Sequence, residues 1–153
     1  MQHAFKLIIA LFAVLLAGPV HADDNHGSAD EAVELVHKVI IAIKAQGRDK
    51  VIAQVNDIQS GTFRDRDLYI TINDMNAKNL AHGANPRMQG KDLIELRDAD
   101  GKAFMRERLA LAKSKGKGWQ EYKFVNPVTR QIEPKAMYFE RFEDLIVNCG
   151  IYK

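Results

Sequence analysis

The chain has 153 residues, with 22 lysines and arginines against 20 aspartates and glutamates. This near balance produces no large electrostatic field, so the composition argues against a protein that binds nucleic acid or an anionic membrane through its charge. Proline and glycine are not enriched enough to suggest disorder. The length suits one ordinary domain with a hydrophobic core.

Residues 1–22 have the pattern of a signal peptide. A lysine precedes the apolar residues 7–17, Pro19 interrupts the run, and Ala22 is a small residue of the kind that a signal peptidase site requires. The apolar run is shorter than the roughly 20 residues needed to cross a bilayer. This favours cleavage after Ala22 over an uncleaved anchor, and it predicts a single exported domain over residues 23–153.

Two helices are expected at the start of this domain. Ser28 or Asp30 can cap the first by accepting hydrogen bonds from its free amide groups. Apolar residues then recur on one helical face as far as Gly47, a residue type that commonly follows a helix end. Residues 48–57 predict a second, shorter helix.

Residues 68–102 predict a strand, a polar turn, a second strand and a loop rich in glycine, asparagine and proline. Leu68, Ile70 and Ile72 alternate with other residue types, which is the period of a half-buried strand. The Asp98-Ala99-Asp100-Gly101 segment that closes this stretch is typical of a turn and a helix cap.

The last third of the chain predicts a helix over residues 102–114 and three strands, at residues 119–125, 132–142 and 145–152. Short turns separate these strands, which favours antiparallel pairing with helices segregated to the sides of the sheet. The expected fold is α+β and PAS-like, with a long N-terminal helix, a five-stranded antiparallel sheet and flanking helices.

Several short motifs occur in order across nearly all of residues 23–153. They are Phe63-Arg64-Asp65-Arg66-Asp67-Leu68-Tyr69-Ile70, Ala81-His82 with Asn85-Pro86, Gly90-Lys91-Asp92-Leu93, Asp98-Ala99-Asp100-Gly101-Lys102, Gly118-Trp119 with Tyr122, Asn126-Pro127, Lys135 with Tyr138, and Cys149-Gly150-Ile151-Tyr152. Each motif alone is weak. The ordered set resembles the single Cache domains of type 2, a family of extracytoplasmic sensor domains.

The resemblance implies a small-molecule pocket between the sheet and the loop around Asn85-Pro86, and a periplasmic location. Ligands in this family are often short organic acids. Receptors of the family normally continue into a transmembrane helix and a cytoplasmic signalling module. Because this sequence ends at Lys153, we expect a free periplasmic binding protein that acts through a membrane receptor or transporter.

Lys135 is the first candidate for ligand contact. It shares a strand face with Met137 and Phe139, and an ammonium among apolar residues needs a partner because a bare buried charge is costly. A ligand carboxylate could serve, as the resemblance suggests. The alternatives are a solvated lysine on an edge strand and an ion pair with Glu133 or Glu121.

Four aromatic residues are further candidates: Tyr69, Trp119, Tyr122 and Tyr138. Tyr122 lies on one face of its strand and Trp119 on the other. Aromatic residues at strand spacing more often belong to the core, but here a pocket would itself be part of the core. A tyrosine hydroxyl suits carboxylate recognition and suits a half-buried strand equally well.

His82 precedes the loop that contains Asn85 and Pro86, and the resemblance places all three at the ligand. A lone histidine is more often structural. No spacing of histidine, cysteine and carboxylate residues indicates a closed metal site, and we expect no metal and no cofactor. No nucleophile motif or phosphate-binding loop is present, so the sequence gives no support to an enzyme.

Two other features have simpler interpretations. The charged residues 64–67 are expected to face solvent. Cys149 is the only cysteine, which leaves no internal disulfide, and it is expected to be a small buried hydrophobic residue rather than a reactive thiol.

These observations favour an exported, non-enzymatic domain that binds a short carboxylic acid. The alternative is an interaction or scaffold protein with a degenerate pocket that forms a homodimer through its first helix. An enzyme with unrecognised chemistry is the third possibility. Ligand screening separates the first two, and turnover of a ligand would indicate the third.

Overall fold

The computed structural model describes residues 26–153, so the expected signal peptide lies outside the described residues. None of the helices within this range is long and apolar enough to cross a membrane. In chain order the elements are α1 (Ala29–Gln46), α2 (Arg48–Asn56), β1 (Arg64–Asp65), β2 (Leu68–Asp74), β3 (Asn79–His82), the 3₁₀ helix η1 (Pro86–Met88), α3 (Phe104–Lys115), β4 (Lys117–Val125), β5 (Ile132–Phe142) and β6 (Leu145–Tyr152).

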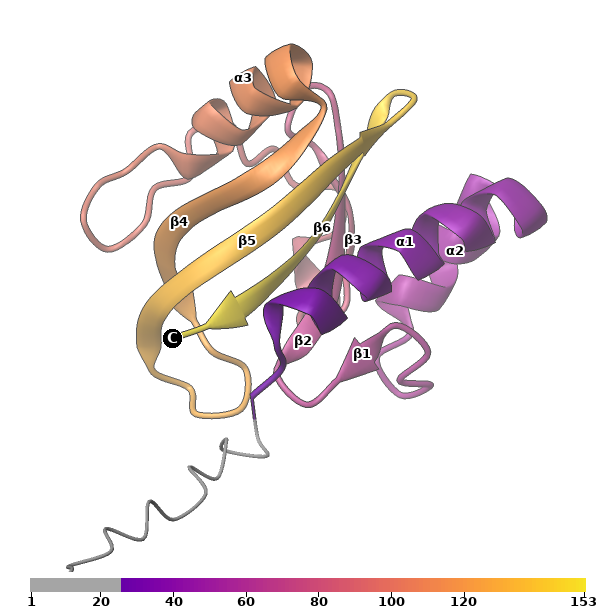
Figure 1. Ribbon diagram of the computed structural model, residues 1–153, viewed down its shortest axis with the longest axis horizontal. Coiled ribbons are helices and arrows are strands. Elements are labelled where there is room, and N and C mark those ends of the chain that lie inside the picture. Colours follow the sequence, from indigo (N-terminus) through magenta and orange to yellow (C-terminus); the bar gives the residue numbers. More distant parts are fainter. Residues whose placement is uncertain (1–25) are drawn as a thin grey trace, which may run out of the picture.

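The strands form one antiparallel sheet in the order β1-β2-β6-β5-β4, with β3 also paired to β2 (Figure 1). The α+β fold expected from the sequence is confirmed. The described sheet has six strands rather than the five expected. The additional strand, β1, has two residues and is too short to produce a periodic pattern.

Helix α1 begins where the sequence predicts. The Ser28 hydroxyl accepts a hydrogen bond from the Glu31 N–H, and the Glu31 carboxylate accepts one from the Ser28 N–H. This reciprocal capping box satisfies two amide groups at the helix start. The helix ends at Gly47, whose φ of 85° suits a residue without a side chain.

The sheet has two distinct faces because side chains alternate along each strand. Leu68, Ile70 and Ile72 pack in one hydrophobic cluster with the buried face of α1. Tyr69 and Thr71 point to the opposite face, which α3 and the long loop before it cover (Figure 1). We call this second side the pocket face.

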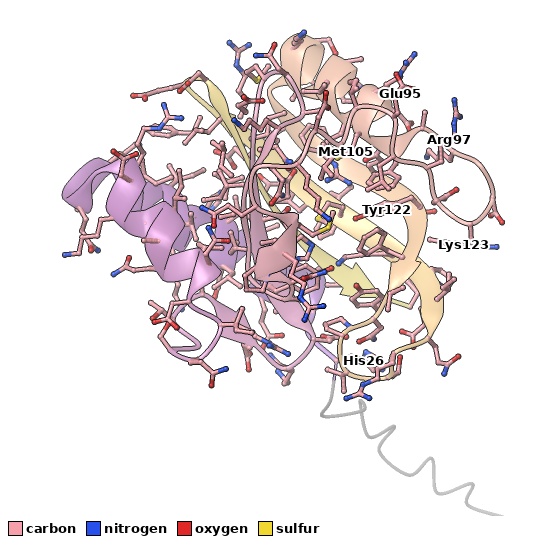
Figure 2. The ribbon with its side chains drawn as sticks, turned by 180° about the vertical axis from the view of Figure 1, so that it is seen from behind. His26, Glu95, Arg97, Met105, Tyr122 and Lys123 are labelled. Carbon is pink, nitrogen blue, oxygen red and sulfur yellow. The ribbon has the colours of Figure 1, made fainter. Side chains whose placement is uncertain are left out.

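Helix α3 and the loop before it close the pocket face. Figure 2 shows Met105 and Tyr122 inside the molecule, whereas Arg97 and Lys123 lie at its rim. Met105 and Phe104 pack against Tyr122 and Met137 of the sheet in a second hydrophobic cluster. The site described below lies beside this cluster.

The turn expected at residues 98–101 is confirmed, but its expected role as a helix cap is wrong. The Asp98 carboxylate accepts hydrogen bonds from the N–H groups of Asp100, Lys102 and Lys123. The carboxylate therefore stabilises the loop and joins it to the edge strand β4. Helix α3 starts at Phe104 and has no side-chain cap.

The charged residues 64–67 do not all face solvent, which corrects the expectation for this segment. Asp67 is fully buried, accepts a hydrogen bond from the Gly27 N–H at 2.8 Å and contacts His26 Nδ1 at 2.6 Å. Arg66 donates to the Glu31 carboxylate at 2.7 Å. These partners lie 35 to 41 residues away in sequence, so the local charge pattern gave no sign of them.

Candidate functional site

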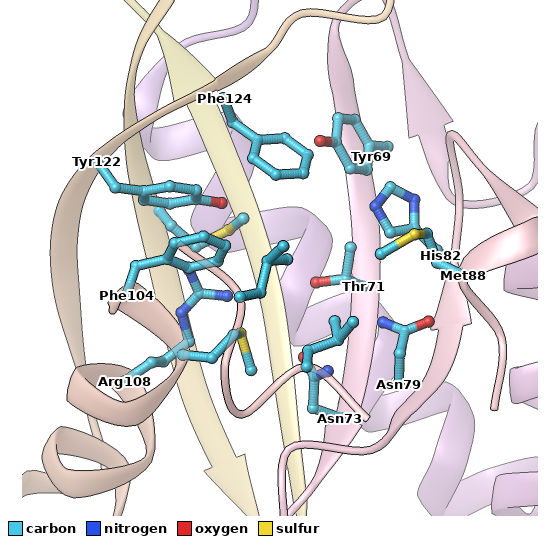
Figure 3. Close-up of a pocket in the computed structure, with 14 residues that line it drawn as sticks. Tyr69, Thr71, Asn73, Asn79, His82, Met88, Phe104, Arg108, Tyr122 and Phe124 are labelled. Atoms are coloured by element: carbon cyan, nitrogen blue, oxygen red, sulfur yellow. The ribbon is translucent and has the colours of Figure 1, made fainter. Parts of the chain in front are cut away.

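A small cavity of about 30 Å³ lies between the pocket face and α3. Figure 3 shows Phe104, Arg108 and Tyr122 on one side, facing Thr71, Asn79 and His82 on the other. A wider pocket of about 240 Å³ adjoins this cavity. The two spaces share the walls formed by Tyr69, His82, Met88 and Phe124.

His82 is a neutral hydrogen-bond donor in this wall. Its Nδ1 accepts hydrogen bonds from the N–H groups of Ala84 and Asn85, so in the neutral ring the hydrogen is on Nε2. Burial lowers the pKa of His82 to about 4, and the charge of Lys135 adds to this effect. The ring stacks on Tyr69 with 5.1 Å between the centroids.

Arg108 is a buried cation that sequence reasoning missed. Its side chain is 2% exposed and lies over the rings of Phe104 and Tyr122, at 5.6 and 5.2 Å from their centroids. Its Nε donates to the Gln120 side-chain oxygen at 3.0 Å. Its buried Nη2 has no hydrogen-bond partner within residues 26–153.

Gln120 holds Arg108 in this position. Its amide nitrogen donates to the backbone oxygen of Phe104 at 2.9 Å and to the Glu107 carboxylate at 2.8 Å. These two bonds fix the amide, so its oxygen points at Arg108. The guanidinium is thus oriented before any ligand binds, which lowers the entropic cost of binding.

Lys135 is buried and only 1% exposed, so of the alternatives that the sequence left open, a solvated lysine on an edge strand is wrong. Its Nζ donates to the hydroxyls of Tyr69 at 2.7 Å and Tyr152 at 2.9 Å, and it lies 4.0 and 4.3 Å from the centroids of their rings. Glu121 instead pairs with Lys153, and the Glu133 carboxylate accepts bonds from Asn126 and Thr129. Neither of the carboxylates considered from the sequence is therefore its partner.

Lys135 is not among the residues that line the cavity; it lies behind Tyr69, which does. Burial lowers the pKa of the lysine to about 7. The Tyr152 hydroxyl donates to the Val125 backbone oxygen and is 3.1 Å from the Tyr69 hydroxyl. The lysine therefore fixes the position of Tyr69 and places a titrating positive charge behind the wall of the site.

Gly150 leaves the space that Lys135 occupies. A Cβ at this position would lie 2.4 Å from Lys135 Cε and 3.1 Å from the Ala136 backbone oxygen. We expect Gly150→Ala to displace the lysine and to lower the free energy of unfolding by about 1–3 kcal/mol, measured by urea denaturation. In a Lys135→Ala background the same change should cost less, and equal costs in both backgrounds would contradict this contact.

Asn85 and Pro86 lie in one loop, but only Asn85 is among the residues that line the wider pocket or the cavity. Asn85 lines the wider pocket, and its side-chain oxygen accepts a hydrogen bond from the Arg87 N–H. Pro86 is the first residue of η1, where its fixed φ suits the start of a helix. Tyr69, His82 and Tyr122 line the cavity itself.

Trp119 and Tyr138 lie on the opposite face of the sheet from the cavity. Their rings pack together with 5.4 Å between centroids, and the Tyr138 hydroxyl donates to Glu140 beside α1. Tyr138 belongs to the hydrophobic cluster of α1. The structure does not bring these two expected ligand contacts to the site, because alternation along β4 and β5 directs them away from it.

The polar residues of the cavity wall were also missed by sequence reasoning, apart from His82. Thr71 and Asn73 lie on β2, and Asn79 lies opposite Asn73 on β3. Alternation with Ile70 and Ile72 could have identified Thr71 and Asn73 as a second face. Arg108 could have been identified because it follows Phe104 by four residues, and residues at this spacing lie on the same face of a helix.

Cys149 is fully buried on the α1 side of the sheet, as expected. Burial raises the pKa of its thiol to about 12. The thiol is therefore protonated at neutral pH, which makes it a poor nucleophile.

The family model for single Cache domain 2 matches residues 21–153. The methyl-accepting chemotaxis protein McpP of Pseudomonas putida is 26% identical over 156 residues, which cover 95% of this chain and 29% of that protein. The sensor histidine kinase MctS of Rhizobium johnstonii is 27% identical over 131 residues, covering 84% of this chain and 24% of the kinase. The chain thus spans less than a third of either relative.

Solved structures show the same fold. A Cache chemosensory domain described for its carboxylic acid recognition has a TM-score of 0.67 and 24% identity, covering 80% of this chain and 91% of that one. A methyl-accepting chemotaxis protein from Vibrio parahaemolyticus has a TM-score of 0.66 and 25% identity, covering 80% and 86%. With the family model matching from residue 21 to the last residue, the chain belongs to the single Cache domain 2 family.

Proposed function

We propose that residues 23–153 form an exported, non-enzymatic sensor domain that binds a short organic acid and passes the bound state to a partner protein. The observation that carries this proposal is Arg108. Its guanidinium is buried on the wall of a cavity and has an Nη2 group without a hydrogen-bond partner in the described chain.

Electrostatics favours an anion at this position. Neither Arg108 nor Lys135 forms an ion pair with a carboxylate of residues 26–153. A buried charge without a counter-charge is costly, and a ligand carboxylate offsets that cost through charge-assisted hydrogen bonds. The neutral His82, as an Nε2–H donor, adds to the same preference.

The shape of the site favours a short acid. The inner cavity, at about 30 Å³, has room only for a small polar group such as the carboxylate of a ligand. The wider pocket of about 240 Å³ has mainly apolar walls that include Ala84, Val125 and Pro127. A carboxylate at Arg108 with a short carbon chain directed toward this pocket satisfies both environments.

The comparisons support a sensory role at the level of the fold. The relatives include chemotaxis and kinase sensors, and a neighbour of the same fold is described for carboxylic acid recognition. We propose that residues 1–22 direct export to the periplasm and that a membrane receptor or transporter recognises the ligand-bound domain.

The test is a thermal-shift screen with acetate, propionate, pyruvate and lactate, each matched with its neutral amide. An acid at 100 times its dissociation constant stabilises the folded state by about 2.7 kcal/mol, which for a domain of this size is a shift of roughly 10 °C. The amides should give no shift. Equal shifts with acids and amides, or none with any acid, would refute anion binding.

One observation favours the alternative of a dimerising interaction protein. Ile41 on α1 is 64% exposed, which leaves an apolar side chain on the outer face of the first helix. A flat response to every acid, together with a concentration-dependent dimer in light scattering that Ile41→Glu abolishes, would favour this alternative.

A further inference from the structure

An exposed apolar surface lies at the turn between β4 and β5. Five large apolar side chains are exposed within residues 26–153, and three of them belong to this turn or to the strand ends beside it. These three are Val125, Val128 and Ile132, which are 48%, 49% and 59% exposed. Val125 and Ile132 are paired across the two strands, so their side chains lie together on one face of the sheet. Apolar groups gathered in this way indicate an interaction surface.

The same side chains line a groove at the open edge of the sheet. Val125 and Ile132 form part of its wall, and its volume is about 250 Å³. β4 is the last strand of the sheet, and the loop that contains Arg97 and Ala99 forms the opposite wall. Both loop residues are exposed, and Figure 2 shows Arg97 and Lys123 on this side of the molecule. The groove is therefore open to solvent.

Two guanidinium groups beside the groove lack an acidic partner. The carboxylates of Asp98, Asp100 and Glu133 are all engaged by donors within the domain. Arg97 donates one hydrogen bond, to a backbone oxygen of its own loop, and Arg130 lies on the turn. Neither arginine forms an ion pair with a carboxylate of residues 26–153. The unmet charge around the apolar surface is thus positive, which favours an acidic partner.

The turn holds Arg130 in a conformation that suits another residue type. Its φ is 62°, a left-handed value that is costly for a residue with a Cβ and that glycine adopts freely. Strained residues of this kind occur often at functional sites. Arginine is also enriched in the cores of protein interfaces, so binding by its side chain accounts for an arginine at this position.

The apolar surface is connected to the proposed ligand site. Val125 lines both the groove and the wider pocket. Its backbone oxygen accepts a hydrogen bond from the Tyr152 hydroxyl at 2.8 Å, and this hydroxyl is 3.1 Å from that of Tyr69 in the cavity wall. A ligand that packs against Val125 or moves Tyr69 therefore changes the position of the exposed side chains.

We propose that Arg97, Val125, Val128, Arg130 and Ile132 form the surface through which a partner protein recognises the ligand-bound domain. This inference rests on the proposed function and deepens it by naming the surface and the chemistry of the partner. The matching segment of the partner has apolar side chains that fill the groove, flanked by aspartate or glutamate residues. Their carboxylates accept charge-assisted hydrogen bonds from the two arginines.

The test is the selection of binding peptides from a random peptide library displayed on phage, with the purified domain as target. The domain is used with and without the acid that gives the largest thermal shift. The selected peptides should combine acidic with apolar residues, and in hydrogen–deuterium exchange they should protect residues 97–101 and 123–132. Their affinity should rise at least about fivefold in the presence of the acid, the lower end of ordinary coupling between two sites.

Two variants identify the contacts. Arg130→Gly keeps the turn, because glycine suits this φ, and should weaken peptide binding about tenfold through the loss of a charge-assisted bond. Ile132→Ser should weaken it by a similar factor. Glu143→Gly makes the same kind of change in the β5–β6 turn, where φ is 55°, and Ile41→Ser removes an exposed apolar side chain from α1. Both controls should leave the affinity within about twofold.

The possible results separate this inference from the proposed function. The docking surface would be overturned by a selection that yields no binding peptide, by peptides that protect another surface such as the outer face of α1, or by full affinity in both Arg130→Gly and Ile132→Ser. Equal peptide affinity with and without an acid that binds would overturn recognition of the bound state and leave acid binding intact. Failure of every acid would overturn the proposed function and this inference together.

Discussion

Replacing Arg108 with methionine is expected to lower the affinity for the bound acid by at least about 100-fold while the domain stays folded. Methionine keeps an apolar stem that can pack over Phe104 and Tyr122, but it removes the charge and the free Nη2 donor. A charge-assisted hydrogen bond contributes about 1.5–3 kcal/mol, and the lost electrostatic attraction of the guanidinium adds to the loss of the bond from Nη2. Calorimetry with the tightest acid of the screen measures the affinity.

Arg106 provides the matched control on the same helix. It is exposed and pairs with Glu95 at the surface, so Arg106→Met should leave the affinity within about twofold. Stability should respond little to Arg108→Met, because removing a buried charge that lacks a counter-charge offsets the lost bond to Gln120. Full affinity in Arg108→Met would rule out this residue as the anion site.

The second large effect is a pair of opposite pH dependences that both arise from Lys135. Burial lowers the pKa of Lys135 from 10.5 to about 7. Between these values the unfolded chain holds a proton that the folded domain has lost, so the free energy of unfolding rises with pH. The ligand-free domain should gain about 2 kcal/mol between pH 7 and pH 9.

Affinity for an acid should fall over the same range. Deprotonation removes the positive charge behind Tyr69, and the carboxylate then loses part of its electrostatic attraction. The window is suitable because the other shifted groups titrate outside it. Burial holds the pKa of His82 near 4 and raises that of Cys149 from 9.0 to about 12, so the thiol opposes the trend from about pH 9 upward.

Urea denaturation and calorimetry at pH 7, 8 and 9 measure the two slopes. Lys135→Met keeps the length of the side chain without its charge and should flatten both. Lys117→Met, at an exposed position on β4, should change neither. Parallel slopes in the unmodified protein and in Lys135→Met would show that another group controls the pH dependence.

Elements with a strong local signal were predictable. The capping box at Ser28 and Glu31, the glycine at position 47 and the alternation in β2 are properties of neighbouring residues, and the structure has the helices and strands that they indicate. The start of α3 was placed two residues early. The Asp98 turn has the composition of a cap, but the Asp98 carboxylate accepts a hydrogen bond from the backbone N–H of Lys123 on the distant strand β4.

The site was less predictable because its members come from separate elements. Tyr69, His82 and Tyr122 were identified as candidates, and they line one cavity. Arg108 was overlooked, since an arginine on a helix ordinarily faces solvent. Its burial depends on Gln120 and on two aromatic rings from β4 and α3, a combination that no local pattern reveals.

The sequence by itself determined the order of the main elements and the family, because periodicity and ordered motifs are local properties of the chain. Only the tertiary structure decided which residues of different strands lie together on one face of the sheet. Trp119 and Tyr138 lie on the α1 side of the sheet, and Asp67 is buried. Arg108, Asn73 and Asn79 come together around one cavity. Burial and pairing depend on residues far apart in sequence, and the chemistry of this site follows from them.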